Sequence, residues 1–394
     1  MAARRLRDLT SLVERASGAP ARDYVRLENP RPGAAVLAIR AEASRLWVKQ
    51  SVMELYDELP EPPRAPVLSP PDSGPAHLNS TGKRKAETTD SENREGCHQE
   101  KKVCKGLLTL KAHVAERRGE REELQDAHTI FDLSQECQPM PADISRLLYF
   151  AVFDGHGGNR AARFAAHNLH RNLLKKVPRG EGSSVEKAMK RCILEAFKQT
   201  DEEFLKQAAS HKPAWKDGTT AICVLVADNV LYIANLGDSR AVLCRINEDT
   251  QKPTVLSLSK EHNPTQYEER MRIQRAGGNV RDGRVLGVLE VSRSLGDGQF
   301  KRLGVSNIPD VKRCPLNQSD RFILLACDGL FKAFSAEEAV TFILTNVQEE
   351  SSPSENSPPV LDARYESACH RLANEAVRRG AADNVTVLLV QIQH

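Results

Sequence analysis

The chain has 394 residues, 40% of them hydrophobic and 28% charged, which is typical of a globular protein with one large domain and extensions, or with two domains. Lysine and arginine number 56 against 53 aspartates and glutamates. This formal net charge of +3 excludes a strongly basic nucleic-acid coat or an acidic tail as the dominant feature.

The sequence also argues against a membrane-spanning protein and against a disulfide-rich or zinc-binding one. No apolar run reaches the roughly 18 residues of a membrane span. The nine cysteines are odd in number and contain no Cys-x-x-Cys pair, which argues against a disulfide framework or a zinc knuckle. We therefore expect thiols in a reducing compartment.

The first hundred residues have the composition of an extension. Residues 1–26 lack the apolar stretch of a secretory signal, and their acids argue against a mitochondrial presequence. Residues 59–100 are rich in proline, serine and charge, so they cannot bury enough surface to offset the entropy of ordering. We expect residues 1–105 to be mostly disordered and residues 106–394 to form a folded domain.

Two basic clusters lie in and beside this segment. They are Lys83-Arg84-Lys85 and Lys101-Lys102-Val103-Cys104-Lys105. Together they resemble a bipartite nuclear-import signal, which predicts a cytoplasmic protein that also enters the nucleus. A solvated, charge-rich linker explains them equally well, so both interpretations stay open.

The first part of the folded region alternates between β and helical patterns. Residues 148–153 form a short apolar run with aromatic and β-branched side chains, which predicts a buried strand. Apolar residues then recur at helical spacing between residues 161 and 173, and residues 185–209 predict a second amphipathic helix.

A series of strands follows. Residues 220–226 and 230–234 predict two strands joined by a tight turn at Asp228-Asn229. Gly237-Asp238 predicts another turn, after which residues 241–244 continue the meander. Such short connections require antiparallel neighbours, because a parallel crossover needs a dozen or more residues.

The last part again combines strands and helices. Residues 322–327 and 384–391 predict strands, residues 336–347 and 365–379 predict helices, and residues 348–362 predict a loop. Many antiparallel strands with separate helices indicate an α+β fold. We expect an antiparallel β-sandwich flanked by α-helices on both sides.

Acidic residues occur at the ends of the predicted strands. Asp154 and Asp328 each follow an apolar run directly, and Asp383 precedes the final strand. Converging carboxylates repel one another unless a cation neutralises them, and hard oxygen ligands favour Mg²⁺ or Mn²⁺ over zinc. A single Asp-Gly pair is more often only a turn, but the ordered set favours a metal site.

The same acids belong to a longer ordered series of motifs. The motifs are Gly119-Glu120-Arg121 through Asp126-Ala127-His128, Val152-Phe153-Asp154-Gly155-His156-Gly157-Gly158, Gly218-Thr219-Thr220-Ala221, Asn235-Leu236-Gly237-Asp238-Ser239-Arg240, Val291-Ser292-Arg293-Ser294-Leu295-Gly296-Asp297, Ala326-Cys327-Asp328-Gly329 and Asp383-Asn384-Val385-Thr386. In this order they resemble the metal-dependent protein phosphatases, the type 2C Ser/Thr phosphatase family, over residues 106–394.

The resemblance implies a protein serine/threonine phosphatase that hydrolyses phosphoserine and phosphothreonine by direct attack of a metal-activated water. It implies two Mg²⁺ or Mn²⁺ ions, held by Asp154, Asp328, Asp383 and the carbonyl of Gly155.

Two further residues take catalytic roles by this resemblance. Arg121 would bind the phosphoryl oxygens, and His156 would protonate the leaving oxygen. Alternatively, Arg121 forms a surface salt bridge with Glu122 or Glu123, and His156 is a structural histidine of the glycine turn.

Two positions depart from the family pattern. Gln125 precedes Asp126 where relatives commonly have glutamate, so one metal site is expected to be weaker. Lys332 stands where many relatives have aspartate, and its charge would repel a third cation. We assign Asp238, Gln125 and Asp126 accessory roles and expect any third metal site to be weak or absent.

Other functions were weighed against this one. A pseudophosphatase-like module that binds a kinase complex would keep the fold without catalysis. A metal-dependent nuclease is disfavoured because the basic clusters lie away from the acids.

Residues from Lys101 onwards and residues 53–62 carry a closer resemblance within the family. It implies the integrin-linked kinase complex as a partner beside phosphorylated protein substrates, and Met53 as an alternative initiator. Cys327, beside Asp328, is a candidate for oxidation sensitivity.

Overall fold

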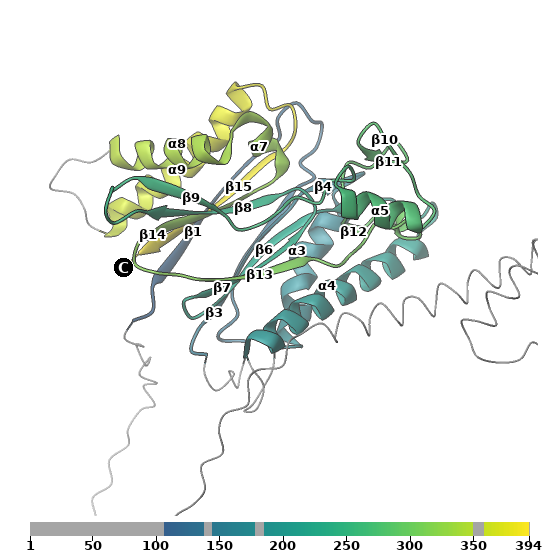
Figure 1. Ribbon diagram of the computed structural model, residues 1–394, viewed down its shortest axis with the longest axis horizontal. Coiled ribbons are helices and arrows are strands. Elements are labelled where there is room, and N and C mark those ends of the chain that lie inside the picture. The colour runs from purple at the N-terminus through teal and green to yellow at the C-terminus, as the bar shows by residue number, and fades with distance from the viewer. Residues whose placement is uncertain (1–105, 138–143, 178–184, 350–357, 394) are drawn as a thin grey trace, which may run out of the picture. The chain divides into compact units, whose positions relative to one another are not determined.

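A computed structural model describes residues 106–137, 144–177, 185–349 and 358–393 (Figure 1). The predicted disordered extension, Met53 and both basic clusters lie outside these residues. Most of the predicted loop at residues 348–362 does as well.

Two five-stranded antiparallel sheets form the centre of the fold. The first has the order β1 (Thr109–Arg117), β15 (Val385–Gln393), β14 (Asp320–Ala326), β8 (Arg240–Ile246) and β9 (Pro253–Ser257). The second has the order β13 (Asp310–Pro315), β7 (Val230–Leu236), β6 (Ala221–Ala227), β3 (Leu147–Phe153) and β2 (Ala127–Asp132).

The sheets pack face to face, and helices cover their outer faces (Figure 1). Val224 and Ile233 of one sheet meet Leu325 and Leu388 of the other in the inner core. Because both faces of each central strand are covered, every residue of β6 is buried, which explains its continuous apolar sequence.

The helices form two outer layers. α3 (Arg160–Leu174) and α4 (Val185–Ser210) pack on the sheet that contains β3. α7 (Asp328–Ala333), α8 (Ala336–Glu349) and α9 (Pro358–Arg378) cover the opposite sheet, as Figure 1 shows. The predicted α+β sandwich with helices on both sides is thus confirmed.

The predicted meander is wrong at one connection. The β6–β7 hairpin forms, with Asp228 at φ 54° in its turn. After Gly237, at φ 108°, the chain leaves that sheet, and β8 pairs with β14 and β9 in the other. The three residues between β7 and β8 can bridge sheets that pack about 10 Å apart, so a short connection does not require neighbouring strands.

A smaller region between β9 and β13 was not predicted. It contains α5 (Tyr267–Arg275), β10 (Val280–Arg281), β11 (Arg284–Val285), β12 (Leu295–Gly296) and α6 (Gly298–Lys301). β12 joins β5 (Gly218–Thr219) and β4 (Gly155–His156) in a short sheet.

The start of one helix differs from the prediction. α9 begins at Pro358 rather than Tyr365, so the predicted loop ends earlier than expected. Within the ranges that the structure describes, no helix has the length and apolar composition to cross a bilayer.

Candidate active site

Five acids from distant parts of the sequence converge at one end of the sandwich. Asp126 precedes β2, Asp154 follows β3, Asp238 lies in the β7–β8 corner, Asp328 begins α7, and Asp383 precedes β15. Carboxylate oxygens of Asp154, Asp238 and Asp328 lie within 4.8 Å of one another. Asp154 also lies within this distance of Asp126 and the thiol of Cys327.

Close backbone contacts hold these segments together. A Cβ atom at Gly329 would collide with the carbonyl oxygen of Asn384, so a larger residue would push Asp328 away from Asp383. The side-chain nitrogen of Asn384 donates to the carbonyls of Arg118 (2.8 Å) and Glu123 (3.1 Å). Asn384 thereby fixes the loop that carries Arg121. Asn384 lies in the Asp383-Asn384-Val385-Thr386 motif, but this role was not predicted from the sequence.

The backbones of Gln125 and Gly155, the two remaining predicted positions, lie in close contact. Gly155 lies in β4, and a Cβ atom there would collide with the carbonyl oxygen of Gln125. The amide of Gln125 donates to Asn384 Oδ1 (2.8 Å). Gln125 and Gly155 are therefore adjacent, beside Asp126, which precedes β2, and Asp154, which follows β3.

Burial and mutual repulsion disfavour the charged form of three of these acids, Asp126, Asp154 and Asp238. Burial and repulsion from neighbouring acids raise the pKa of Asp154 well above its ordinary value. Burial also raises the pKa of Asp126 to about 6 and that of Asp238 to about 7. These shifts are expected where several like charges share a poorly solvated site.

The donor set fits hard divalent cations. Asp126 Oδ2 accepts a hydrogen bond from Thr386 Oγ1 (2.7 Å), while its Oδ1 is buried without a hydrogen-bond partner. A cation would neutralise the clustered charge, and oxygen ligands of this kind suit Mg²⁺ or Mn²⁺. Asp154, Asp328, Asp383 and the carbonyl of Gly155 are the residues that would hold such ions.

Cys327 is not suited to oxidation. Its side chain is fully buried, its Sγ lies 3.1 Å from the amide of Thr386, and its thiol lies 3.3 Å from the carbonyl of Asn384. Burial and the neighbouring Asp126 raise the pKa of the thiol well above its ordinary value. Because the thiolate is the reactive form, the structure argues against the predicted oxidation sensitivity.

Two cations face the acids. Arg121 Nη2 lies 3.0 Å from Asp383 Oδ2, so its guanidinium meets this acid rather than Glu122 or Glu123. Lys332 Nζ lies 2.6 Å from Asp328 Oδ2 and 3.2 Å from Asp383 Oδ2. Burial alone would raise the pKa of Asp383, but the amide of Asn384 and these two cations lower it.

His156 is held by an acid that the sequence analysis left without a role. Its Nε2 lies 2.7 Å from Asp297 Oδ2, which also accepts from Ser294 Oγ at 2.6 Å. Burial alone would lower the pKa of His156, but the charge and hydrogen bond of Asp297, together with the charges of Asp238 and Asp217, raise it. Asp297 ends the Ser294-Leu295-Gly296-Asp297 motif, so the sequence marks it as a candidate site residue. The motif does not indicate which histidine Asp297 contacts.

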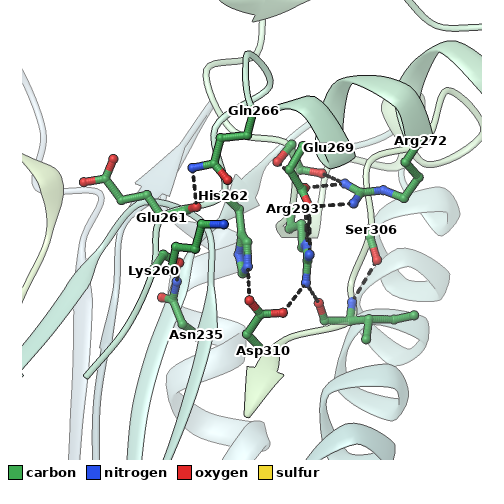
Figure 2. Close-up of polar contacts among 12 residues, drawn as sticks. Asn235, Lys260, Glu261, His262, Gln266, Glu269, Arg272, Arg293, Ser306 and Asp310 are labelled. Atoms are coloured by element: carbon green, nitrogen blue, oxygen red, sulfur yellow. Dashed lines mark hydrogen bonds and ion pairs between the residues drawn. The ribbon is translucent and has the colours of Figure 1, made fainter. Parts of the chain in front are cut away.

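A ladder of ion pairs runs from Glu269 in the smaller region to His262 (Figure 2). Arg293 links buried Glu269 (2.7 Å) to Asp310 (2.8 Å), and His262 Nε2 lies 3.2 Å from Asp310. The amide of Gly237 donates to His262 Nδ1 at 3.1 Å. This hydrogen bond connects the ladder to Gly237, the residue before Asp238.

Two cavities open beside the acids, and Lys332 lines both. One, of about 330 Å³, is lined by Asp238, Asp328 and residues of the β10–β11 hairpin. The other, of about 350 Å³, is lined by Arg121 and Asp383. Both are large enough for a phosphoryl group and its attached side chain, and they place cations next to the carboxylates.

Comparison with known proteins agrees with this geometry. The family model described as "Protein phosphatase 2C" matches residues 111–385. The chain belongs to the protein phosphatase 2C family. It is a protein serine/threonine phosphatase, as predicted, and the nuclease alternative has no support.

Individual relatives extend this result. Integrin-linked kinase-associated serine/threonine phosphatase 2C of Bos taurus is 59% identical over 368 residues, which cover 86% of this chain and 100% of the bovine protein. The Homo sapiens protein of that name is 64% identical over 323 residues, covering 80% and 82%. Serine-threonine phosphatase 2C from Toxoplasma gondii shares the fold, with a TM-score of 0.58 at 22% identity over 73% of this chain and 97% of that one.

Proposed function

We propose that this protein phosphatase 2C hydrolyses phosphoserine and phosphothreonine in proteins at the five-acid cluster, with two Mg²⁺ or Mn²⁺ ions as cofactors. The observation that carries the proposal is the convergence of carboxylate oxygens of Asp154, Asp238 and Asp328 within 4.8 Å of one another, where burial and neighbouring acids raise the pKa of Asp154. When bound, the cations would lower the pKa of water and screen the phosphoryl charge.

The protein's own residues would orient the substrate. Arg121 is 60% exposed and sits at the edge of a cavity beside the acids, where its planar guanidinium can bind two phosphoryl oxygens. Such fixed donors stabilise the charge that develops as the phosphorus–oxygen bond breaks. Gln125, Asp126 and Asp238 have accessory roles in holding the centre.

His156 would supply the proton for the leaving group. With Nε2 bound to Asp297, its Nδ1 is the nitrogen left to protonate the serine or threonine oxygen. Water attacks phosphorus in line, the bond to the side-chain oxygen breaks, and no phosphoenzyme forms. Asp297 keeps the ring oriented and favours the protonated form.

The test is turnover of a phosphothreonine peptide with Mn²⁺, with and without chelator. We expect Asp154→Asn to lose at least about a hundredfold in kcat while its circular dichroism stays unchanged. Lys198→Met, in the exposed Lys198–Glu202 pair on α4, is the control and should match the wild type. Equal turnover by Asp154→Asn and the wild type would refute the proposed centre.

The pseudophosphatase alternative is not favoured, because the acids, Arg121 and His156 are all present and lie together.

Binding to a kinase complex can nevertheless accompany catalysis. The two mammalian relatives are named for association with integrin-linked kinase. We propose that this chain joins the same complex, and co-precipitation of integrin-linked kinase with the tagged full chain tests it. Failure of the full chain to retain the kinase would oppose it.

For localisation we propose the cytoplasm and the nucleus. Support comes from Lys83-Arg84-Lys85 and the cluster at residues 101–105. Residues 80–106 fused to an inert reporter should drive it into the nucleus, and alanines in both clusters should abolish this. A reporter confined to the cytoplasm would leave only the linker interpretation.

A further inference from the structure

Lys332 occupies an unusual place in the acidic cluster. It lies in the last turn of α7, four residues after Asp328, and this spacing brings an Asp–Lys pair together on one helix face. Its ammonium contacts Asp328 Oδ2 at 2.6 Å and Asp383 Oδ2 at 3.2 Å. One lysine thus bridges two acids that come from α7 and from the loop before β15.

The same two carboxylates belong to the proposed ligand set for divalent cations. An ammonium and a metal ion cannot occupy the space between one pair of carboxylate oxygens together, because both need close contact and they repel each other. A cation that binds Asp328 Oδ2 and Asp383 Oδ2 must therefore first displace Lys332.

The side chain of Lys332 is built for such displacement. It is 51% exposed, and it lines the cavities on both sides of the acids, so it has open space to move into. A lysine is a flexible, strongly hydrated point charge, which makes exchange with another cation easier than for a forked guanidinium. Asp328 is much less accessible, with 19% of its side chain exposed.

We propose that Lys332 is an internal counter-ion that competes with divalent cations for Asp328 and Asp383, and thereby sets the cation affinity of this chain. The inference rests on the proposed metal-dependent function. It extends that function by making the centre self-neutralising before ions bind. The energetic consequence is that Lys332 stabilises the ion-free protein and weakens the ion-bound one.

The experiment is calorimetric titration of Mn²⁺ into the chelator-treated full chain. We expect Lys332→Met to bind Mn²⁺ about tenfold more tightly than the wild type, because a competing charge has been removed. The chelator-treated variant should also melt at a lower temperature than the wild type, with a larger rise on adding Mn²⁺. Lys332→Arg keeps the charge but presents a forked guanidinium that is harder to displace, so it should bind Mn²⁺ no more tightly than the wild type.

Controls separate the possible failures. Lys198→Met removes a lysine from an exposed pair and should leave Mn²⁺ affinity unchanged. Should Lys332→Met fold poorly, Lys332→Gln makes the same prediction with a polar side chain. Unchanged or weaker Mn²⁺ binding by the neutral variants would overturn only this inference. Absence of Mn²⁺ binding to the wild type and the variants alike would overturn the metal centre as well.

Discussion

The ring of His156 shows how a single contact defines a chemical role. Asp297 has φ 51°, in the left-handed region, and receives hydrogen bonds from both His156 and Ser294. A non-glycine residue in that conformation is held there by its surroundings. We interpret Asp297 as a positioning residue that acts through His156.

This role predicts a dependence on the leaving group. Asp297→Asn should lower kcat for a phosphothreonine peptide by about a hundredfold, because the alkoxide leaving group needs a proton. It should lower kcat for p-nitrophenyl phosphate far less, because p-nitrophenolate leaves without protonation. The measurement is the ratio of the two kcat values, and His156→Gln should give the same ratio. Equal losses on both substrates would point to a purely structural effect.

At the residue scale, sequence reasoning predicted the acids but not their partners. Asp154, Asp328 and Asp383 were predicted from their positions at strand ends, and the structure brings them together. The contact between Asp297 and His156 was not predictable, because it joins segments separated by 141 positions. Only the packing of β12 and β4 on opposite sides of β5 makes it possible.

At the scale of elements, the ion-pair ladder joins the smaller region to the sandwich. Glu269 is 3% exposed and accepts from Arg272, Arg293 and Ser292. Burial would raise its pKa, but these partners lower it below its ordinary range. Removing one member of a buried charged group leaves the other members unpaired, which is costly.

Substitution of Glu269 should therefore destabilise the protein. We expect Glu269→Gln to reduce the free energy of unfolding by about 3 kcal/mol, since Arg272 and Arg293 would lose their counter-charge. Chemical denaturation at neutral pH measures this value. Lys198→Met on α4 serves as the control. A loss no larger than that of this control would show that the ladder adds little.

The ladder also predicts how stability changes with pH. A hydrogen bond from His262, opposed by burial and helped by Arg293, lowers the pKa of Asp310 to about 2. A carboxyl whose pKa is lowered on folding stabilises the protein above its unfolded pKa, and this contribution is lost as the pH falls toward 2. Melting temperatures from pH 5 to pH 2 should thus fall less steeply for Asp310→Asn than for the wild type. Parallel curves would contradict this assignment.

On the scale of the whole molecule, one folded unit accounts for all described chemistry. Each of the five acids, and both cations that contact them, lies between residues 106 and 394. The family model likewise covers residues 111–385. We propose that residues 106–394 form the catalytic domain and that residues 1–105 are an extension.

This division predicts that the fragment 106–394 folds alone. It should unfold cooperatively at the midpoint of the full chain and keep the same kcat on a phosphothreonine peptide, since both the core and the site lie within it. Differential scanning calorimetry and steady-state kinetics check the two statements. A fragment that is insoluble or much less active would assign residues 1–105 a part in the fold.

The sequence by itself determined the ordered motifs, the long helices α3, α4, α8 and α9, and the strands β3, β6, β7, β8, β14 and β15, because these depend on local periodicity and on residues close together in the chain. Tertiary structure decided which sheet receives β8, which acid orients His156, and that Lys332 bridges Asp328 and Asp383. Each of these outcomes depends on how distant segments pack, and no local pattern specifies that packing. The net charge of +3 likewise does not reveal the cluster of mostly half-buried acids that only the fold assembles.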